Sequence, residues 1–447
     1  MLRATAALAL LGCAACGAPA GPPQAPPPDV VLVVVDTLRA DHLGFDGYRR
    51  PTSPHLDRLA AGSSVFTQAR AQAPCTAPSV NSLLTSRHPW DFAGRPFGHL
   101  GIPRGMPTVA GLLRRAGYRT AAVSASPVVR ATPGEINREG GFGHGFDLFL
   151  EGCERRDARC VGRRAEDLLG LLPRPFFLYL HYFDPHDPYA APDGAPRRFA
   201  TPYAGSDEAV AAGDPLPAVR RLHERGDAGL GAGDLAHLVD LYDEEIAYVD
   251  HGIGELIARL DLDRTLLVVT SDHGESFLEH GHLQHCRSLY DPELRVPLLV
   301  RPPGGSAPRR VDTPVALLDV TPTLLDYAGV EKANGMAGRS LRPAVEGRSL
   351  RTRPATAAMT TRRSLVEGRW KLIHDLETGG TELYDLPSDP AERANLLAER
   401  PRVTNRLLAF LDRHLRAVEG EGLEATDERL EKGREEERRL RALGYLP

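Results

Sequence analysis

The sequence has no excess of basic residues. Its 447 residues include 54 lysines and arginines against 59 aspartates and glutamates, which gives a formal net charge of −5. Because nucleic-acid-binding domains need a basic surface, this balance predicts no nucleic-acid partner. The 44 glycines and 38 prolines are spread along the chain without a period, so no repeat architecture is predicted. The length and composition are typical of one large α/β domain with a smaller companion.

Long hydrophobic runs are also missing. The N-terminal apolar run, residues 4–11, follows Arg3 and is too short to span a bilayer. Cys13 and Cys16 follow it among small residues, and a proline-rich stretch comes next. This order is similar to a bacterial lipoprotein signal, in which Cys16 or Cys13 would be lipidated and the prolines would form an extended tether. We therefore expect residues 1–28 to be signal and tether, and the exported chain to face the periplasm or cell surface, held to the membrane by lipid alone.

Cysteines are few, and four remain after the leader. Cys153 and Cys160 are close in sequence and could form a local disulfide in an oxidising compartment. Cys75 and Cys286 each adjoin a polar motif, but spacing alone does not establish any pairing.

Three continuous apolar runs predict strands that are buried on both faces. They are residues 30–35, 176–182 and 265–270, with weaker strands expected at 121–124 and 296–300. Helical patterns lie between them, at 106–116 and 235–260. Strands that alternate with helices predict a largely parallel sheet covered on both sides, which we assign to residues 29–330.

The pattern changes after residue 330. Residues 364–373 and 382–386 predict short strands, and residues 402–418 predict a helix. We therefore expect a smaller α+β subdomain over residues 331–420 and a charged C-terminal helix over residues 421–447.

Polar residues follow the strongest strands directly. Asp36 ends the first, and Asp272 and His273 end the third. Each carboxylate could simply cap a helix, but ligands of parallel sheets bind beyond the carboxyl ends of the strands. Two carboxylates and one imidazole form a ligand set suited to Ca, Zn, Mn or Mg.

A hydroxyl lies at the predicted start of a helix. Thr76 occupies the expected N-cap, with Pro78 in the first turn. A capping role is the simple interpretation. A helix start also stabilises an oxyanion, and a nearby cation would lower the pKa of the hydroxyl and make it a nucleophile.

Eight segments of the sequence, which include those around Asp36, Thr76 and Asp272, resemble motifs of the sulfatase family of the alkaline-phosphatase superfamily and occur in the same order. They are residues 34–44, 73–87, 181–189, 242–250, 270–276, 295–298, 318–324 and 382–390. The resemblance implies an alkaline-phosphatase-like α/β/α sandwich with a large mixed, mostly parallel sheet and a smaller C-terminal α+β subdomain. It also implies a hydrolase of ester bonds acting on an anionic small molecule.

The resemblance implies one divalent cation held by Asp36, Thr76, Asp272 and His273. It also places His186 against the anionic group of the substrate.

Four further residues are candidates with less support. His285 or His282 could bind the oxyanion or protonate the leaving group, although each is as readily a solvated loop residue. Arg39 and His181 are candidates for substrate binding, and Arg39 could equally be structural.

The sequence departs from the family at the nucleophile. Family sulfatases usually carry Cys-x-Pro-Ser-Arg, whose cysteine becomes formylglycine, whereas residues 76–80 read Thr-Ala-Pro-Ser-Val. Thr37 also replaces a second family aspartate, and residues 120–127 lack the usual lysine and histidine. A threonine cannot release sulfate as a formylglycine hydrate does, but water can attack a phosphorylated threonine. The pattern favours phosphate mono- or diesters or phosphonate esters.

Three alternatives stay open. The chain could be a true sulfuric-ester hydrolase, which either uses Thr76 by another route or has Cys75 as the modified residue. It could also be a phosphoethanolamine-type transferase or a non-catalytic lipoprotein that binds anions.

Overall fold

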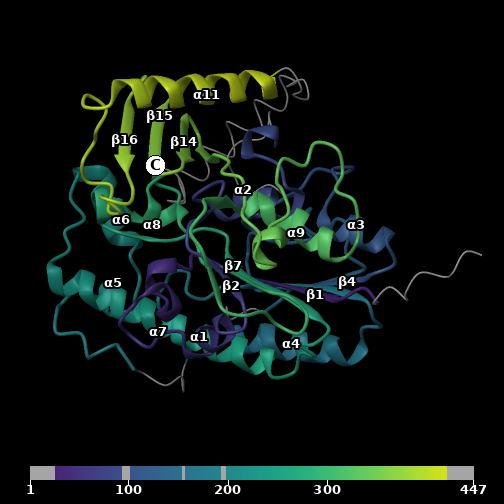
Figure 1. The fold of residues 1–447 in the computed structure, drawn as a ribbon. Helices are drawn as coiled ribbons and strands as arrows, with labels where there is room; N and C mark the ends of the chain where they lie inside the picture. Colours follow the sequence, from purple (N-terminus) through teal and green to yellow (C-terminus); the bar gives the residue numbers. More distant parts are fainter. Residues whose placement is uncertain (1–25, 93–100, 154–156, 193–197, 420–447) are drawn as a thin grey trace, which may run out of the picture.

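A computed structural model describes residues 26–92, 101–153, 157–192 and 198–419 (Figure 1). The lipidation candidates Cys13 and Cys16 and the predicted helix over residues 421–447 lie outside the described residues. Within the described ranges, none of the helices combines the length and apolarity needed to cross a bilayer.

An eight-stranded sheet forms the centre of the molecule, in the order β11-β2-β10-β7-β1-β6-β4-β5. Its strands are β1 (Asp29–Val35), β2 (Ser64–Phe66), β4 (Arg119–Ser124), β5 (Leu148–Leu150), β6 (Phe176–Tyr182), β7 (Thr265–Ser271), β10 (Leu298–Arg301) and β11 (Arg309–Val311). Strands β7, β1, β6, β4 and β5 are parallel, while β10 runs antiparallel to both β7 and β2. The predicted mixed, mostly parallel sheet is confirmed.

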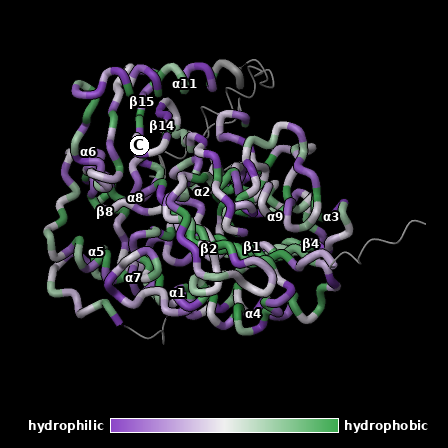
Figure 2. The backbone as a smooth tube through the Cα atoms, in the orientation of Figure 1, coloured by the Kyte–Doolittle hydropathy of each residue, from purple (hydrophilic) through white to green (hydrophobic). Residues whose placement is uncertain are grey.

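Helices cover both faces of this sheet (Figure 1). One face carries α1 (Pro54–Ala60), α4 (Ala158–Leu171) and α7 (Ala232–Ile257), and the other carries α2 (Thr76–Thr85), α3 (Val109–Arg115) and α9 (Val320–Tyr327). Successive side chains of β1 enter the two separate cores, because a strand alternates its side chains between faces. The strands consequently form the most hydrophobic layer of the molecule (Figure 2).

The C-terminal subdomain is a four-stranded antiparallel sheet. It contains β13 (Ala355–Met359), β14 (Arg362–Glu367), β15 (Trp370–Asp375) and β16 (Thr381–Asp385). Residues 364–373, predicted as strand, thus fall in two strands joined at Gly368, whose φ of +60° suits a tight turn. Helix α11 (Pro401–Glu419) packs Leu407 and Leu411 onto this sheet.

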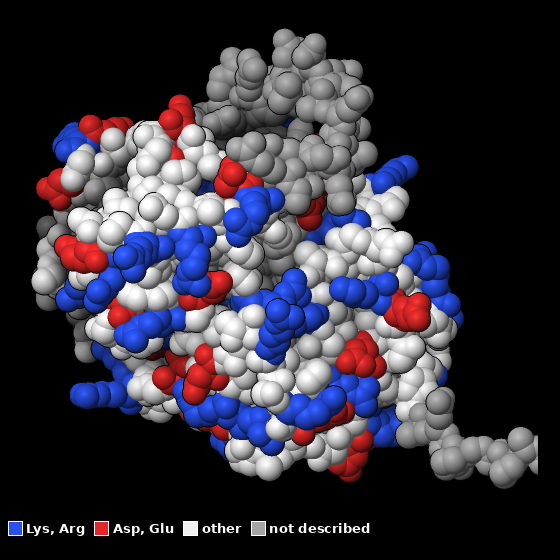
Figure 3. Space-filling view, turned by 45° about the horizontal axis from the view of Figure 1, so that its top comes forward, with Lys and Arg blue, Asp and Glu red and all other residues white. Residues whose placement is uncertain are grey.

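Short helices and strands complete the chain. They are α5 (Glu208–Ala211), α6 (Leu216–Arg225), α8 (Asp291–Leu294), α10 (Arg342–Val345), β3 (Ala69–Arg70), β8 (Ser276–Phe277), β9 (Leu283–Gln284) and β12 (Val315–Ala316). On the face drawn in Figure 3, basic and acidic side chains are interspersed. Exposed ion pairs of this kind stabilise a fold only slightly.

Candidate active site

The site lies where the carboxyl ends of β1, β6 and β7 meet. Val35, the last residue of β1, pairs with Tyr182 of β6 and Ser271 of β7. Asp36 and Asp272 therefore leave the sheet at the same level, on adjacent strands. The parallel pairing of β1 with β7 thus brings together Asp36 and Asp272, which are more than two hundred positions apart in the sequence.

Asp36, Asp272 and His273 form a compact set of metal-binding groups. One ligand atom from each lies within 4.8 Å of the others. Nε2 of His273 lies 3.7 Å from Oδ1 of Asp36 and 3.6 Å from Oδ2 of Asp272. All three side chains are fully buried. This separation leaves space for an ion at the centre of the set.

The charges of this set fit a cation. Oδ1 of Asp36 and Oδ2 of Asp272 are buried and accept no hydrogen bond from the described residues. Burial and the neighbouring charge of Asp36 raise the pKa of Asp272. Burial opposes ionisation of Asp36 as well, but the His181 hydrogen bond and nearby histidines lower its pKa overall. A bound divalent ion would supply the missing partner of both carboxylates.

Hydrogen bonds orient the ligand atoms. Nδ1–H of His273 donates to the carbonyl of Gly274 at 2.9 Å, which turns Nε2 toward the carboxylates. Oδ1 of Asp272 accepts from the backbone N–H of His273 at 2.9 Å and of Thr37 at 3.3 Å. Such contacts fix the tautomer and the rotation of metal ligands.

Thr76 joins the set from helix α2. Its Oγ1 lies 3.2 Å from Nε2 of His273, and Ser79 of the same helix donates to the carbonyl of Asp272 at 2.6 Å. The helix begins one residue earlier than predicted, because Cys75 is the N-cap and Thr76 is the first helical residue. The first N–H groups of a helix have no acceptor within it, so they can stabilise an anion beside Thr76.

His181, a predicted substrate ligand, lies behind Asp36. Its Nε2–H donates to Oδ2 of Asp36 at 3.3 Å, and the Tyr179 hydroxyl donates to its Nδ1 at 2.8 Å. The ring is fully buried. Its position therefore supports an orienting role for Asp36 rather than contact with a substrate.

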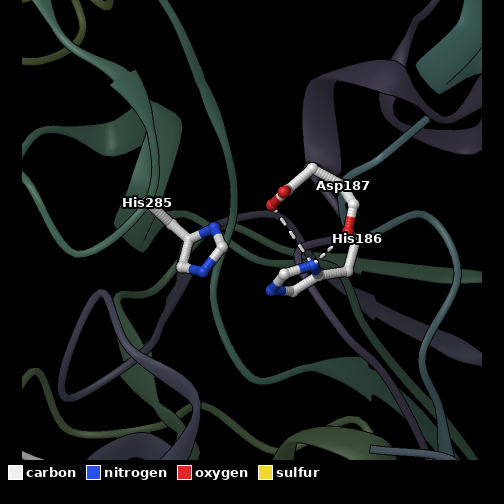
Figure 4. Close-up of side chains that lie close together, drawn as sticks. All are labelled: His186, Asp187 and His285. Atoms are coloured by element: carbon white, nitrogen blue, oxygen red, sulfur yellow. Dashed lines mark hydrogen bonds and ion pairs between the residues drawn. The ribbon is translucent and has the colours of Figure 1, made fainter. Parts of the chain in front are cut away.

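His186 and His285 lie beside each other, with Asp187 next to both (Figure 4). The ring of His285 is 4.7 Å from that of His273 and 4.8 Å from that of His186, between centroids. A disulfide between Cys75 and Cys286 joins the residue before Thr76 to the residue after His285. This covalent link holds the predicted nucleophile and His285 near each other. The suggested Cys153–Cys160 pairing is also present.

Arg39 and His282 have other surroundings. The Arg39 guanidinium pairs with Asp41 at 2.8 Å and Glu279 at 2.7 Å, at the edge of a separate cavity of about 1070 Å³. This placement favours the structural interpretation of Arg39. The His282 ring lies 6.4 Å from that of Tyr290, on the side of Arg362 and Glu382. Neither position suggests contact with the Thr76 hydroxyl.

Sequence reasoning missed two acidic residues of the pocket. Asp187 follows His186 directly, and Glu275 lies two residues after His273. Both stood inside matched motifs, but nothing in their spacing indicated that Glu275 would contact His285. Thr37, where the family has an aspartate, offers a buried Oγ1 without a hydrogen-bond partner among the described residues.

The fold and the side chains of this site are those of an α/β protein that hydrolyses ester bonds. The family described as Sulfatase matches residues 28–330, and the family described as N-sulphoglucosamine sulphohydrolase, C-terminal, matches residues 278–419. The chain belongs to the sulfatase family.

Individual relatives have low sequence identity to this chain, but the matches cover most of its length. A choline-sulfatase of Rhizobium meliloti is 29% identical, over 84% of this chain and 83% of that protein. The structure of BT1596, a 2-O GAG sulfatase, has a TM-score of 0.71 at 21% identity and covers 88% of this chain and 93% of its own. The phosphonate monoester hydrolase SpPMH from Silicibacter pomeroyi has a TM-score of 0.68 at 22% identity. The match covers 87% of this chain and 95% of that chain. At these identities, the two structures establish the fold alone.

Proposed function

We propose that the protein hydrolyses phosphate mono- or diesters or phosphonate esters, with Thr76 as the nucleophile and one divalent cation held by Asp36, Asp272 and His273. The observation that carries this proposal is the position of Oγ1 of Thr76, 3.2 Å from Nε2 of His273 and beside two unpaired carboxylate oxygens. A hydroxyl in this position, at a helix start, is placed for attack on an anionic ester.

The identity of the nucleophile favours phosphorus over sulfur. Thr76 has a single hydroxyl, so a sulfated form could not collapse by elimination as a formylglycine hydrate does. Cys75, the residue that could have been modified instead, is bonded to Cys286. The sulfatase fold also accommodates phosphonate chemistry, because SpPMH shares it.

The proposed reaction has two displacements. A cation bound by Asp36, Asp272 and His273 would polarise the ester and lower the pKa of the Thr76 hydroxyl. The Thr76 oxygen attacks phosphorus while its proton passes to water, the ester P–O bond breaks, and His285 gives a proton to the departing oxygen, so that an alcohol leaves. Water then attacks the phosphorylated Thr76, which restores the hydroxyl and releases phosphate or phosphonate. The N–H groups at the start of α2 stabilise the negative charge that develops on the oxygens.

A substrate panel tests the proposal. The full chain, supplied with a divalent ion, should hydrolyse nitrophenyl phosphate or phosphonate esters faster than nitrophenyl sulfate. Thr76→Ala should lower kcat by at least about 10³-fold, as loss of a covalent nucleophile does. Thr76→Ser should retain part of the activity. Thr85→Ala is the matched control, because Thr85 lies at the far end of α2 and bonds only to the Asn81 carbonyl among described contacts. Faster sulfate hydrolysis, or full activity of Thr76→Ala, would refute the proposal.

We also propose that the chain is exported and lipid-anchored through Cys16 or Cys13. Two disulfides in the described structure support an oxidising compartment. Mass spectrometry of the N-terminal peptide from membranes should find a lipidated cysteine, and Cys16→Ser or Cys13→Ser should release the protein. An unmodified N-terminus on a membrane-free protein would contradict this proposal.

A further inference from the structure

The Cys75–Cys286 disulfide ties the start of helix α2 to the loop that carries His285. The two cysteines are 211 positions apart in the sequence, and both are buried. One directly precedes Thr76, the proposed nucleophile, and the other directly follows His285, the proposed proton donor. We propose that this disulfide is a positioning device for catalysis, which holds His285 where it can protonate the oxygen that departs as Thr76 attacks. This inference rests on the proposed function.

The backbone on both sides of His285 has a conformation that side chains rarely adopt. Gln284 and Cys286 have φ angles of +67° and +61°, in the left-handed region where glycine is the usual residue. Backbone of this kind persists only where the surrounding structure holds it. The disulfide supplies such a constraint, together with the hydrogen bond from the backbone N–H of Cys286 to the carbonyl of Pro74 at 2.9 Å.

The remainder of the loop has its own anchors, so that breaking the disulfide should not unfold it. Before His285, strand β9 pairs with β8. After Cys286, the carboxylate of Glu293 accepts hydrogen bonds from the backbone N–H groups of Arg287 and Ser288 at 3.0 and 3.2 Å. The disulfide therefore constrains a short stretch that contains His285, while the elements on either side are held by other contacts.

The contact with Glu275 orients the ring of His285, whereas the disulfide relates the ring to Thr76. Nδ1 of His285 lies 3.2 Å from Oε1 of Glu275, which belongs to the segment after β7. Thr76 lies on α2, and the backbone N–H of Ser79 in the first turn donates to the carbonyl of Cys75 at 3.1 Å. A misplacement of about 1 Å between reacting groups can lower a rate by about 10²-fold. The cross-link limits such a displacement between α2 and the loop.

The dependence of the rate on the leaving group tests the inference. Cys75→Ala/Cys286→Ala removes the disulfide, and Cys153→Ala/Cys160→Ala, which removes the local disulfide next to α4, is the matched control. The full chains, supplied with a divalent ion, are assayed on the phenyl and nitrophenyl esters of the same acid. Phenoxide is the stronger base, so its departure depends more on a proton donor.

We expect a loss that depends on the ester. Cys75→Ala/Cys286→Ala should lower kcat on the phenyl ester by about 10²-fold and on the nitrophenyl ester by less than about fivefold, with KM changed by less than about threefold. The control variant should match the wild type on both esters. A smaller folded fraction would instead lower both rates equally.

A double-mutant cycle links the loss to His285. His285→Ala should show the same preference for the nitrophenyl ester as the disulfide variant. Combined with Cys75→Ala/Cys286→Ala, it should lower kcat on the phenyl ester little further, because both changes remove the same proton transfer. Additive losses would contradict the inference.

Equal losses on the two esters, or no loss on either, would overturn it. If circular dichroism shows that the disulfide variant is unfolded, the Cys153→Ala/Cys160→Ala protein is reduced with dithiothreitol instead. The dithiol gives two electrons to the Cys75–Cys286 disulfide, which becomes two thiols, and is itself oxidised to a cyclic disulfide. The reductant is removed, the divalent ion is restored, and the same two esters are compared.

The outcome is distinguishable from failure of the proposed function. Full activity of Thr76→Ala would defeat the proposed function. A wild-type activity that depends on Thr76, together with wild-type rates in the disulfide variant, would defeat the positioning inference alone.

Discussion

Two regions of the molecule bury charged side chains, and they differ in how those charges are paired. The first is the metal-binding set of Asp36, Asp272 and His273. The second is a group between the large sheet and the C-terminal subdomain, here called the interface cluster. It consists of Arg70, Asp291, Lys371 and Glu392, all of them buried.

Every charge of the interface cluster meets an opposite one. Arg70 binds Asp291 through two nitrogens at 2.6 and 3.0 Å. Lys371, fully buried on β15, lies 2.7 Å from both Asp291 and Glu392. In the metal-binding set, by contrast, two like charges are adjacent. Oδ1 of Asp36 and Oδ2 of Asp272 accept no described hydrogen bond, and they lie 3.7 and 3.6 Å from Nε2 of His273. The difference indicates that the interface cluster holds two parts of the fold together, and it supports the proposal that a cation completes the set of Asp36, Asp272 and His273.

The largest expected effect is a loss of activity on substitution of Asp272 in the metal-binding set. Asp272→Asn should lower kcat by at least about 10³-fold. In metal-free buffer it should leave the free energy of unfolding unchanged or raise it by about 1–2 kcal/mol, because repulsion from Asp36 is removed. Kinetic assays and chemical denaturation in the presence of a chelator measure both effects.

Added divalent ion should raise the melting temperature of the wild type more than that of Asp272→Asn. Asp263→Asn, an exposed position before β7, is the matched control. If Asp272→Asn lost several kcal/mol of stability in metal-free buffer, the contrast between the two regions would fail.

An aspartate-to-asparagine substitution at the interface cluster should lower the stability of the protein and leave kcat nearly unchanged, the reverse of the effect at Asp272. Asp291→Asn leaves Arg70 and Lys371 buried without their shared partner, so it should cost about 3–5 kcal/mol of stability. The kcat of the remaining folded protein should change little, because Asp291 does not contact the Thr76 pocket. Urea denaturation measures the loss, and an unchanged midpoint would show that the cluster is not structural.

A smaller effect, on metal affinity, is expected when the hydrogen bond from His181 to Asp36 is removed. His181→Ala removes the donor to Oδ2 of Asp36 and should weaken metal affinity by about 10–100-fold, as loss of outer contacts does at other metal sites. Tyr179→Phe removes only the next hydrogen bond and should have a weaker effect. Calorimetric titration with a divalent ion measures both, and equal affinity in His181→Ala and wild type would place His181 outside the metal site.

The smallest expected effect is on how the free energy of unfolding changes at low pH. The charges of Arg70 and Lys371 outweigh the effect of burial and hold the pKa of Asp291 well below its usual range. A lowered folded-state pKa stabilises the protein above the unfolded-state pKa, and this contribution disappears as the pH falls below about 4. The free energy of unfolding should therefore drop by up to about 1.4 kcal/mol per pH unit from this group. Asp291→Asn should make the acid slope shallower, and an identical slope would contradict the assignment.

Much of the fold could be predicted from the sequence because its strongest strands are buried on both faces. Residues 176–182 were predicted as a strand and form β6, and residues 265–270 fall within β7 (Thr265–Ser271). The antiparallel direction of β10 and the turn at Gly368 were not predicted, since short strands carry little periodicity. Asp36, Asp272 and His273 were also accessible, because the carboxyl ends of parallel strands meet at one edge.

The sequence by itself determined the layered α/β architecture, the family and the positions of Asp36, Asp272 and His273 after the ends of β1 and β7, because buried runs and their ending residues are local signals. Only the tertiary structure decided that Cys75 pairs with Cys286, that His181 stands behind Asp36, and that His285 rather than His282 joins His186. These contacts link strand ends and loops far apart in the chain, and their geometry is fixed by packing against the sheet rather than by neighbouring residues.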